Sequence, residues 1–197
     1  YALVELECAG LLSGIVTQNV DGLHKEAGTE TLIPLHGDME HVVCLNCGYA
    51  EDRGAFDARL AAANPGYLER WVVRADEVNP DGDVALSQQA VDEFVMAPCI
   101  RCGSELLKPD VVYFGEPVPA ERRDAARDLL ARSSSLIVVG SSLAVMSGYR
   151  FMLDALKQGK EVSVINGGPG RGDPKATTLW RTQVAPAFDE LLDLLDV

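Results

Sequence analysis

The stretch SLIVVGSSL, residues 135–143, decides the fold class of this chain. Its apolar run is typical of a buried strand, and it enters a tight polar turn at Gly140. Helical patterns precede and follow it, at 119–133 and 148–159, and residues 161–166 again have a strand pattern. Strands that alternate with helices predict an α/β fold with a parallel, doubly wound sheet.

Further elements of this sheet domain are expected towards both ends of the chain. We predict helices at 1–12 and 186–197, strands at 14–20 and 111–116, and a short strand and turn at 32–39. Only four or five strands are visible, and the usual first strand-turn-helix of a nucleotide-binding sheet is not among them. Because the first residue is Tyr1 and not Met, we expect the numbering to begin inside a longer protein.

The composition is that of a globular protein that can bury a core, with 47% hydrophobic and 24% charged residues in 197 positions. A formal net charge of −13 argues against general nucleic-acid binding, which rests on a basic surface. No run approaches the roughly 18 apolar residues that a membrane helix needs. We therefore expect neither a nucleic-acid partner nor a membrane partner.

Four of the five cysteines stand in two Cys-x2-Cys pairs, CLNCG and CIRCG, namely Cys44, Cys47, Cys99 and Cys102. Each pair places two thiolates on one side of a tetrahedral zinc ion, and the glycine after it permits a tight turn. With four cysteine ligands, the zinc is expected to be structural. Iron and a redox pair are the alternatives, and a four-thiolate ribbon could equally bind nucleic acid or protein. Cys8 is left over.

The 51 residues between the two pairs have the composition of an insertion rather than a core. They hold 10 acidic and 4 basic residues, and turn signals stand at 64–66 and 79–82. We expect loops and helices here, with the metal fastening the insertion onto itself. The predicted domains are therefore a sheet domain, 1–38 and 110–197, and an inserted zinc-binding module, 39–109.

Polar side chains follow several of the predicted strands. In TQNVDGLH, residues 17–24, Gln18 and Asn19 come at the end of a strand, before Asp21 and Gly22. A surface turn explains the aspartate and the glycine, but not the two amides. Ligands of open parallel sheets bind at the carboxyl ends of strands, so these residues are candidates for a binding site.

Two glycine-containing turns follow other strands. Ser141 and Ser142 could donate hydrogen bonds to a sugar or a phosphate, although a serine that caps a helix would give the same pattern. The loop INGGPGRGD, 165–173, resembles a dinucleotide loop but lacks G-x-G-x-x-G. On that test the chain is not an ordinary Rossmann dehydrogenase, and we interpret the RGD tripeptide as part of a loop.

His36, in LHG, is one of three histidines. A lone histidine is more often structural than catalytic, but this one lies at a strand end, beside Gly37. An imidazole supplies a general base near neutral pH, so His36 is a catalytic candidate. We assign no role to His24, at a helix start, or to His41, before the first cysteine pair.

The segment PDVVYFGEP, residues 109–117, has two interpretations. It could be a core strand. Its change from apolar residues to Phe114, Gly115 and Glu116 suggests instead an exposed edge that pairs with a peptide.

Taken in order, these pieces resemble the sirtuins, which are NAD-dependent protein deacylases. The resemblance rests on TQNVDGLH, LHG, the two cysteine pairs, KPDVVYFGE, GSSL and IN, and it covers nearly the whole chain. PDGDV, GYRF and RGD favour the branch with mitochondrial and related bacterial members. The resemblance implies a Rossmann-like sheet with an inserted zinc ribbon and one Zn²⁺. It also implies acyl-lysine proteins as substrates, in the bacterial cytoplasm or the mitochondrial matrix.

The resemblance implies a role for each matching residue. His36 and Asn19 are implied as catalytic, with His36 as the general base on the ribose hydroxyls. NAD contacts are implied for Gln18, Asn19, Val20, Asp21, Gly140, Ser141, Ser142, Asn166, Gly167 and Gly168. An acyl-lysine tunnel is implied for Val112, Phe114, Gly115 and Glu116. In the implied reaction the acyl oxygen attacks the anomeric carbon of NAD, and the products are nicotinamide, free lysine and O-acyl-ADP-ribose.

One departure from the family pattern concerns the start of the chain. Sirtuins begin with a Gly-Ala-Gly-Ile-Ser-type phosphate loop and an Ile-Pro-Asp-Phe-Arg-type segment, neither of which precedes Tyr1. On this ground the 197-residue chain alone is expected to bind NAD poorly and to turn over little or not at all. Mono-ADP-ribosyl transfer is an alternative activity, and a catalytically silent, zinc-stapled binding module is an alternative class.

Overall fold

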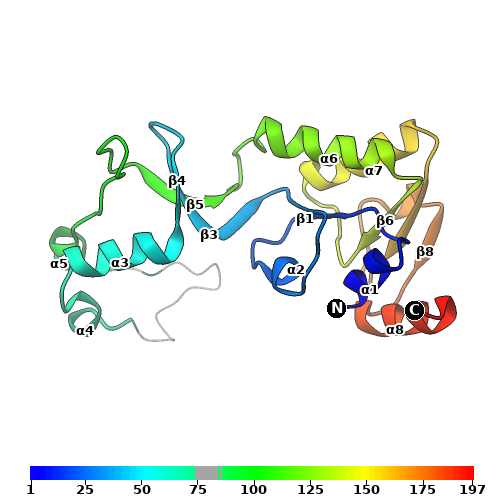
Figure 1. Cartoon of the computed structure of the whole chain (residues 1–197), viewed down its shortest axis with the longest axis horizontal. Coiled ribbons are helices and arrows are strands. Elements are labelled where there is room, and N and C mark those ends of the chain that lie inside the picture. Colours follow the sequence, from blue (N-terminus) through cyan, green and yellow to red (C-terminus); the bar gives the residue numbers. More distant parts are fainter. Residues whose placement is uncertain (74–83, 85) are drawn as a thin grey trace. The chain divides into compact units, whose positions relative to one another are not determined.

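The computed structural model describes residues 1–73, 84 and 86–197 (Figure 1). The chain divides into two compact units: unit 1 comprises Tyr1–Gly37 with Val112–Val197, and unit 2 comprises Asp38–Val111. The predicted turn at 79–82 and most of the PDGDV motif lie outside the described residues. Among the helices of the described part, none is long and apolar enough to cross a membrane.

Unit 1 contains two parallel sheets. β1 (Ile15–Thr17) pairs with β2 (Leu32–Pro34), and Pro34 stands at the end of its strand because it has no N–H to donate. The second sheet has the order β6-β7-β8, with β6 (Ser135–Val139), β7 (Glu161–Ile165) and β8 (Thr178–Trp180) all parallel. Parallel strands joined by helices confirm the predicted α/β class.

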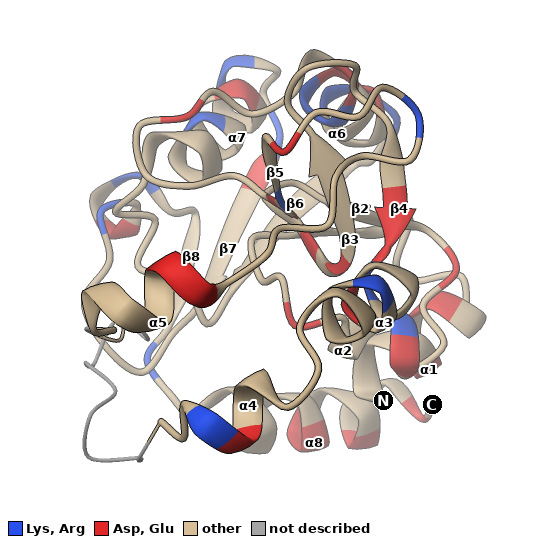
Figure 2. Ribbon diagram, turned by 90° about the vertical axis from the view of Figure 1, so that its left-hand side faces the viewer, with Lys and Arg blue, Asp and Glu red and all other residues tan. Residues whose placement is uncertain are grey.

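Helices cover the β6-β7-β8 sheet on both faces (Figure 1 and Figure 2). α6 (Ala120–Arg132) and α7 (Met146–Lys157) lie on one face, and α1 (Ala2–Cys8) and α8 (Val184–Leu195) lie on the other. The core beneath α7 includes Met152, Val162 and Val164, each no more than 2% exposed. Unit 1 also contains the short helix α2 (Leu23–Glu26) and the 3₁₀ turn η2 (Asp173–Lys175).

The first predicted strand is shorter than expected. Instead of spanning 14–20, it ends at Thr17, and its residues are only half-buried. The Thr17 hydroxyl accepts a hydrogen bond from Asn19 N (3.1 Å), which turns the chain away from the strand direction. Gln18 and Asn19 therefore follow the strand rather than belonging to it. The first helix likewise ends at Cys8, before Gly10, whose φ of 72° is incompatible with a continuing helix.

The strand predicted at 111–116 lies elsewhere. The observed strand is β5 (Leu107–Val111), and a turn closed by Glu116 N and Tyr113 O (3.0 Å) follows it. Lys108 and Pro109 interrupt the apolar pattern of β5. The strand was therefore predicted in the more apolar segment that follows, and this prediction is wrong. β8 lies in a stretch for which no strand was predicted.

Unit 2 has a three-stranded sheet of order β4-β3-β5, in which β3 (Gly37–Cys44) and β4 (Ala50–Asp52) are antiparallel. The Asp52 side chain caps α3 (Arg53–Ala63) by accepting from Ala55 N (2.9 Å). Val42, Phe56 and Ala97 form a small buried core. Cores of this size are commonly supplemented by a structural metal. Two further helices are α4 (Tyr67–Arg70) and α5 (Gln88–Glu93).

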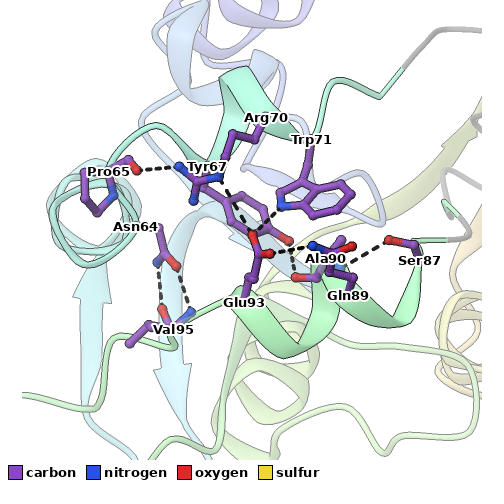
Figure 3. Close-up of polar contacts among 10 residues, drawn as sticks. All are labelled: Asn64, Pro65, Tyr67, Arg70, Trp71, Ser87, Gln89, Ala90, Glu93 and Val95. Carbon is purple, nitrogen blue, oxygen red and sulfur yellow. Dashed lines mark hydrogen bonds and ion pairs between the residues drawn. The ribbon is translucent and has the colours of Figure 1, made fainter.

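Polar contacts hold the α4 and α5 region of unit 2 together (Figure 3). The buried Tyr67 hydroxyl donates to Ala90 O (2.8 Å) across the two helices. Asn64 forms two hydrogen bonds with the backbone of Val95, from Asn64 Nδ2 to Val95 O and from Val95 N to Asn64 Oδ1, each 2.7 Å long. These contacts join parts of the predicted insertion that are far apart in the sequence.

Candidate active site and metal centre

The ends of β1 and β2 bring Gln18 and His36 together in unit 1. The parallel ladder continues one step past the strands, since Leu35 N donates to Thr17 O (2.9 Å). Gln18 follows Thr17, and His36 follows Leu35. Leu35 is only 1% exposed, so its burial fixes the position of the segment that carries His36. His36 is therefore held beside Gln18 at the carboxyl edge, where ligands bind in parallel sheets.

Both ring nitrogens of His36 have a partner. Nδ1 lies 3.2 Å from Gln18 O, and Nε2 lies 2.7 Å from the Ser147 hydroxyl. A carbonyl oxygen can only accept, so the neutral imidazole carries its proton on Nδ1 and its lone pair on Nε2. This tautomer leaves Nε2 as the nitrogen that can take up a proton.

The Gln18 side chain is held by the turn after β6 and by α7. Its Oε1 accepts from the Ser141 hydroxyl (3.1 Å), and Gly148 leaves room for the amide because it has no side chain. The N-cap of α7 is Val145, without a side-chain cap bond. Ser141 and Ser142 therefore do not cap this helix, and the helix-cap interpretation of these serines is wrong.

Asn19, Val20 and Asp21 form the turn between β1 and α2. Asn19 is exposed, and Asp21 accepts a hydrogen bond from Leu23 N (3.1 Å), which orders the start of α2. The turn thus presents an amide and a carboxylate directly after Gln18.

The turn after β6 and the loop after β7 lie side by side. Gly140 N donates to Ile165 O (2.9 Å), and the φ of Gly140 is 59°, a left-handed conformation that favours glycine. Ser142 O accepts from Arg171 N (2.7 Å). The serines and the glycine-rich loop therefore form one continuous polar edge.

Asp173 and Arg181 hold the loop after β7 in shape. Asp173 Oδ2 accepts from Arg181 Nη2 (2.6 Å) and from Gly170 N (2.6 Å), while Arg181 Nη1 and Asn166 Nδ2 both donate to Gly168 O. The Arg181 guanidinium, and after it the Gly170 N–H, lower the pKa of Asp173. Neither residue was predicted from the sequence, because Asp173 stands in an RGD tripeptide that gives no specific signal, and Arg181 lies eight positions further on, directly after β8.

The segment predicted to bind the substrate is a turn next to His36. Val112 N donates to His36 O (2.8 Å). In the turn that follows, Gly115 has a φ of 91°, Phe114 is 97% exposed, and Glu116 Oε2 accepts from a backbone N–H of the same turn (3.1 Å). This segment therefore offers an exposed aromatic side chain rather than the predicted edge strand.

The four cysteines of the two pairs form one cluster in unit 2. All four Sγ atoms lie within 4.8 Å of one another, with Cys44 and Cys102 at 3.6 Å and Cys47 and Cys99 at 3.7 Å. Zn–S bonds of about 2.3 Å in a tetrahedron place the sulfurs about 3.8 Å apart, so this donor set fits Zn²⁺. Four protein ligands are typical of a structural site, and the predicted four-thiolate cluster is confirmed.

The two Cys-x2-Cys turns have the same backbone geometry. Gly48 N donates to Cys44 O (2.9 Å), and Gly103 N donates to Cys99 O (2.8 Å). Both glycines have a positive φ, 69° and 74°, which other residues rarely adopt. Each turn is therefore shaped by its glycine, as the spacing predicted.

The thiols of the cluster ionise unequally. Hydrogen bonds from the Ser104 backbone and then the Asn46 amide lower the pKa of Cys102 to about 6. At Cys47 the Tyr49 backbone lowers the pKa, but desolvation and the neighbouring thiols outweigh it and raise the pKa to about 12. The pKa values of Cys102 and Cys47 are thus shifted in opposite directions within one cluster, and a bound divalent cation favours the thiolate form of its cysteine ligands.

Comparisons with known proteins extend these observations. The model of the Sir2 family matches residues 1–147. NAD-dependent protein deacetylase 1 of Corynebacterium efficiens is 60% identical over 197 residues, which are 100% of this chain and 70% of that protein. NAD-dependent protein deacetylase 1 of Streptomyces coelicolor is 46% identical over 186 residues, 94% of this chain and 60% of that protein. The human mitochondrial NAD-dependent protein lipoamidase sirtuin-4 is 41% identical over 196 residues, 100% and 60% respectively.

Solved structures of the same group share the fold. A Sir2 structure with a bound acetylated peptide has a TM-score of 0.76 at 25% identity, covering 99% of this chain and 68% of that one. A complex of Sir2 with p53 peptide and NAD+ has a TM-score of 0.75 at 26% identity, with the same coverage of 99% and 68%. The chain spans 60 to 70% of the length of the three relatives described above.

Proposed function

The chain belongs to the Sir2 family, and on this premise we propose that it carries the reaction centre and the zinc module of an NAD-dependent protein-lysine deacylase. The products are nicotinamide, O-acyl-ADP-ribose and a free lysine. The observation that supports this best is the position of His36 at the ends of β1 and β2. Its Nε2 is the proton-accepting nitrogen, and the Gln18 backbone fixes its Nδ1.

In this proposal unit 1 binds NAD along the polar edge at the strand ends. Gln18, Asn19 and Asp21 face the nicotinamide and its ribose, because they follow β1 next to His36. The adenosine side lies against the turn after β6 and the loop after β7, which adjoin each other. The remaining NAD contacts are Val20, Gly140, Ser141, Ser142, Asn166, Gly167 and Gly168.

The protein's own groups then act on protons and orientation. Bound NAD supplies an anomeric carbon from which nicotinamide can leave. His36 Nε2 is the final acceptor when a ribose hydroxyl loses its proton, and the imidazolium that results keeps its Nδ1–H on Gln18 O. Because that bond holds the ring on one side, the acceptor nitrogen stays aimed at the same point before and after the transfer. Asn19 is the second catalytic residue in this proposal.

The acyl-lysine binds beside the turn at 112–116. Val112 is fastened to His36 through their backbones, so the apolar part of this turn starts next to the base. Phe114, which is 97% exposed, offers apolar surface to the acyl-lysine chain. Gly115 and Glu116 complete the segment.

Zinc has a structural part in this proposal, with one ion per chain in the four-thiolate cluster. Zinc thiolates require reduced cysteines, which a cytosolic environment maintains. This requirement, together with the bacterial relatives, supports a cytoplasmic protein.

A chimaera in which this chain replaces the matching segment of the Corynebacterium efficiens relative provides the test. It is mixed with NAD and with peptides that carry acetyl-lysine or lipoyl-lysine, since the relatives are named for both activities. Mass spectrometry follows the products, with the 197-residue chain in parallel. We expect equal amounts of nicotinamide, O-acyl-ADP-ribose and free-lysine peptide from at least one substrate. His36→Ala should reduce all three to a small residual level, as expected for loss of a general base, whereas His24→Ala, on α2, should not.

Two other results would replace the proposal. Release of nicotinamide with ADP-ribose attached to protein would favour the mono-ADP-ribosyltransferase. No NAD consumption with either peptide, in a folded chimaera that contains zinc, would favour the zinc-stapled binding module.

A further inference from the structure

The hydrogen bonds of His36 leave neither ring nitrogen open. Nδ1 is engaged by Gln18 O, and Nε2 accepts from the Ser147 hydroxyl at 2.7 Å. In the neutral tautomer a ring nitrogen has one proton or one lone pair, so both capacities of the ring are used. A substrate hydroxyl that gives up a proton therefore contacts the Ser147 hydroxyl, which occupies the lone pair of His36 Nε2.

Ser147 is placed there by the fold. It is the second residue of α7, and the next residue, Gly148, packs against the Gln18 side chain. The turn before the helix fixes the same amide, because the Ser141 hydroxyl donates to Gln18 Oε1 (3.1 Å). The start of α7 is thus tied to both β1 and β2, and the Ser147–His36 contact is built into this docking.

We propose that Ser147 relays the proton between the reacting hydroxyl and His36. This inference rests on the proposed deacylase function. The Ser147 oxygen donates its proton to Nε2 and keeps two lone pairs, so it can accept a hydrogen bond from a second hydroxyl at the same time.

The relay moves two protons and leaves Ser147 unchanged. The O–H bond of the substrate hydroxyl breaks and its proton goes to Ser147 Oγ, while the former Ser147 proton goes to His36 Nε2. The substrate oxygen keeps the electron pair and becomes the nucleophile. His36 becomes the imidazolium, held at Nδ1 by Gln18 O.

The first test needs no NAD. Nitrogen NMR of the ¹⁵N-histidine-labelled 197-residue chain, which has three histidines, should show His36 as the Nδ1–H tautomer with a hydrogen-bonded Nε2. In Ser147→Ala the Nε2 resonance should move towards that of a free lone pair, while the resonances of His24 and His41 stay in place. Ser147→Thr keeps a hydroxyl and should restore the Nε2 resonance. An Nε2 resonance that is identical in Ser147→Ala would overturn the inference.

The second test is a double-mutant cycle in the chimaera described above. Ser147→Ala should lower kcat by roughly 10²-fold, the low end of what a general base contributes, and leave the KM for NAD unchanged. Ser147→Thr should retain most of the activity. Because Ser147 acts through His36, Ser147→Ala should not lower kcat any further in a His36→Ala background. An equal loss in both backgrounds, or a change confined to KM, would overturn the relay.

The two proposals fail in distinguishable ways. A folded chimaera that consumes no NAD refutes the deacylase, and the relay falls with it even if NMR shows the Ser147–His36 bond. A Ser147→Ala chimaera as active as its parent refutes the relay alone and leaves His36 as a base that meets its substrate directly.

Discussion

The Gln18 amide lies directly against Gly148, and the space between them has no room for a methyl group. A Cβ added at Gly148 would lie 2.7 Å from Gln18 Nε2 and 2.9 Å from Gln18 Oε1. The obstacle is the end of a flexible side chain, so Gly148→Ala should displace Gln18 rather than unfold the protein. Since Gly148 lies inside α7, alanine also improves the intrinsic helix propensity by about 1 kcal/mol.

We therefore expect Gly148→Ala to separate stability from ligand binding. The melting temperature should stay level or rise, while the affinity for NAD falls by up to about tenfold, the value of one hydrogen bond. Thermal unfolding and an NAD titration, both on the chimaera described above, measure the two quantities. In a Gln18→Ala background the same substitution should not change NAD affinity, and a further loss there would show that the contact with Gln18 is not the cause.

The carboxylate of Asp173 should make stability depend on pH in the acidic range. Its pKa in the folded chain is lowered from 3.8 by Arg181 and by Gly170 N–H, so folding favours the ionised form. The stabilisation is fully present above pH 3.8 and is lost as the pH falls through the lower, folded-state value. Asp173→Asn should reduce the urea midpoint at pH 7, and the gap to the parent should close below pH 3.8.

Asp189→Asn, on the exposed side of α8, serves as the matched control for this pH dependence. Because its side chain is exposed, this substitution should leave the urea midpoint at pH 7 close to that of the parent. A gap for Asp173→Asn that stays constant down to the acidic end would argue against the Arg181–Asp173 pair as its source.

Among the ion pairs in the described part of unit 2, Arg59–Glu51 should be the one whose loss destabilises the protein most. Arg59 bonds both oxygens of the buried Glu51 carboxylate (2.9 and 2.6 Å) and also donates to Pro98 O (2.8 Å), next to the second cysteine pair. Arg59→Ala leaves a buried carboxylate without its partner and should cost about 3 kcal/mol of unfolding free energy. Arg53→Ala, in the same helix, removes an exposed pair with Asp57 and should cost less than about 1 kcal/mol.

Denaturant unfolding of the zinc-loaded chain measures both variants. Arg59→Lys keeps the charge but not the two-pronged geometry, so its unfolding free energy should fall between those of Arg59→Ala and the parent. Equal costs for Arg59→Ala and Arg53→Ala would show that the buried pair adds nothing beyond a surface pair.

Removal of zinc should unfold unit 2 selectively. Its core is small, whereas unit 1 has a core of its own around Met152 and Val162. After chelation, hydrogen exchange should become fast at Val42 and Phe56 and stay slow at the core residues of unit 1. Retained protection at Val42 after chelation would show that the metal is not needed for the fold of unit 2.

Cysteine variants test the metal ligands separately. Cys99→Ala should abolish the stoichiometric zinc, and Cys8→Ala, on α1 of unit 1, should keep it. Metal analysis of the purified proteins gives the ratio of zinc to chain. One zinc per chain in Cys99→Ala would contradict the four-thiolate site.

The meeting of Gln18 and His36 follows from a general rule. Both residues follow short strands, and the ends of parallel neighbours lie at the same edge of a sheet. The two Cys-x2-Cys turns could also be predicted from the sequence, because two cysteines and a glycine at fixed spacing specify the geometry of the turn. The sequence does not predict which cysteine of one pair lies next to which cysteine of the other, for example that Cys44 Sγ lies 3.6 Å from Cys102 Sγ.

Ser147 could not be recognised in the same way. The predicted helix began at Gly148, and the observed one begins at Met146 without a capping side chain, so no local signal marks its first turn. Its contact with His36 joins residues 111 positions apart and depends on how α7 docks. The three-residue strand β8 is similarly hidden, because Leu179 and its neighbours are too few to show a period.

Asn64 and Val95 are 31 positions apart in the sequence, yet two hydrogen bonds join them as if they were opposite residues of a hairpin. The cost of closing a flexible loop grows only with the logarithm of its length, by roughly 0.6 kcal/mol for each doubling. Because these two hydrogen bonds close the stretch at its base, we expect the stretch to accept an inserted peptide. Affinity tags or recognition peptides inserted there should add a new binding property to the chain and leave the four-cysteine zinc site intact.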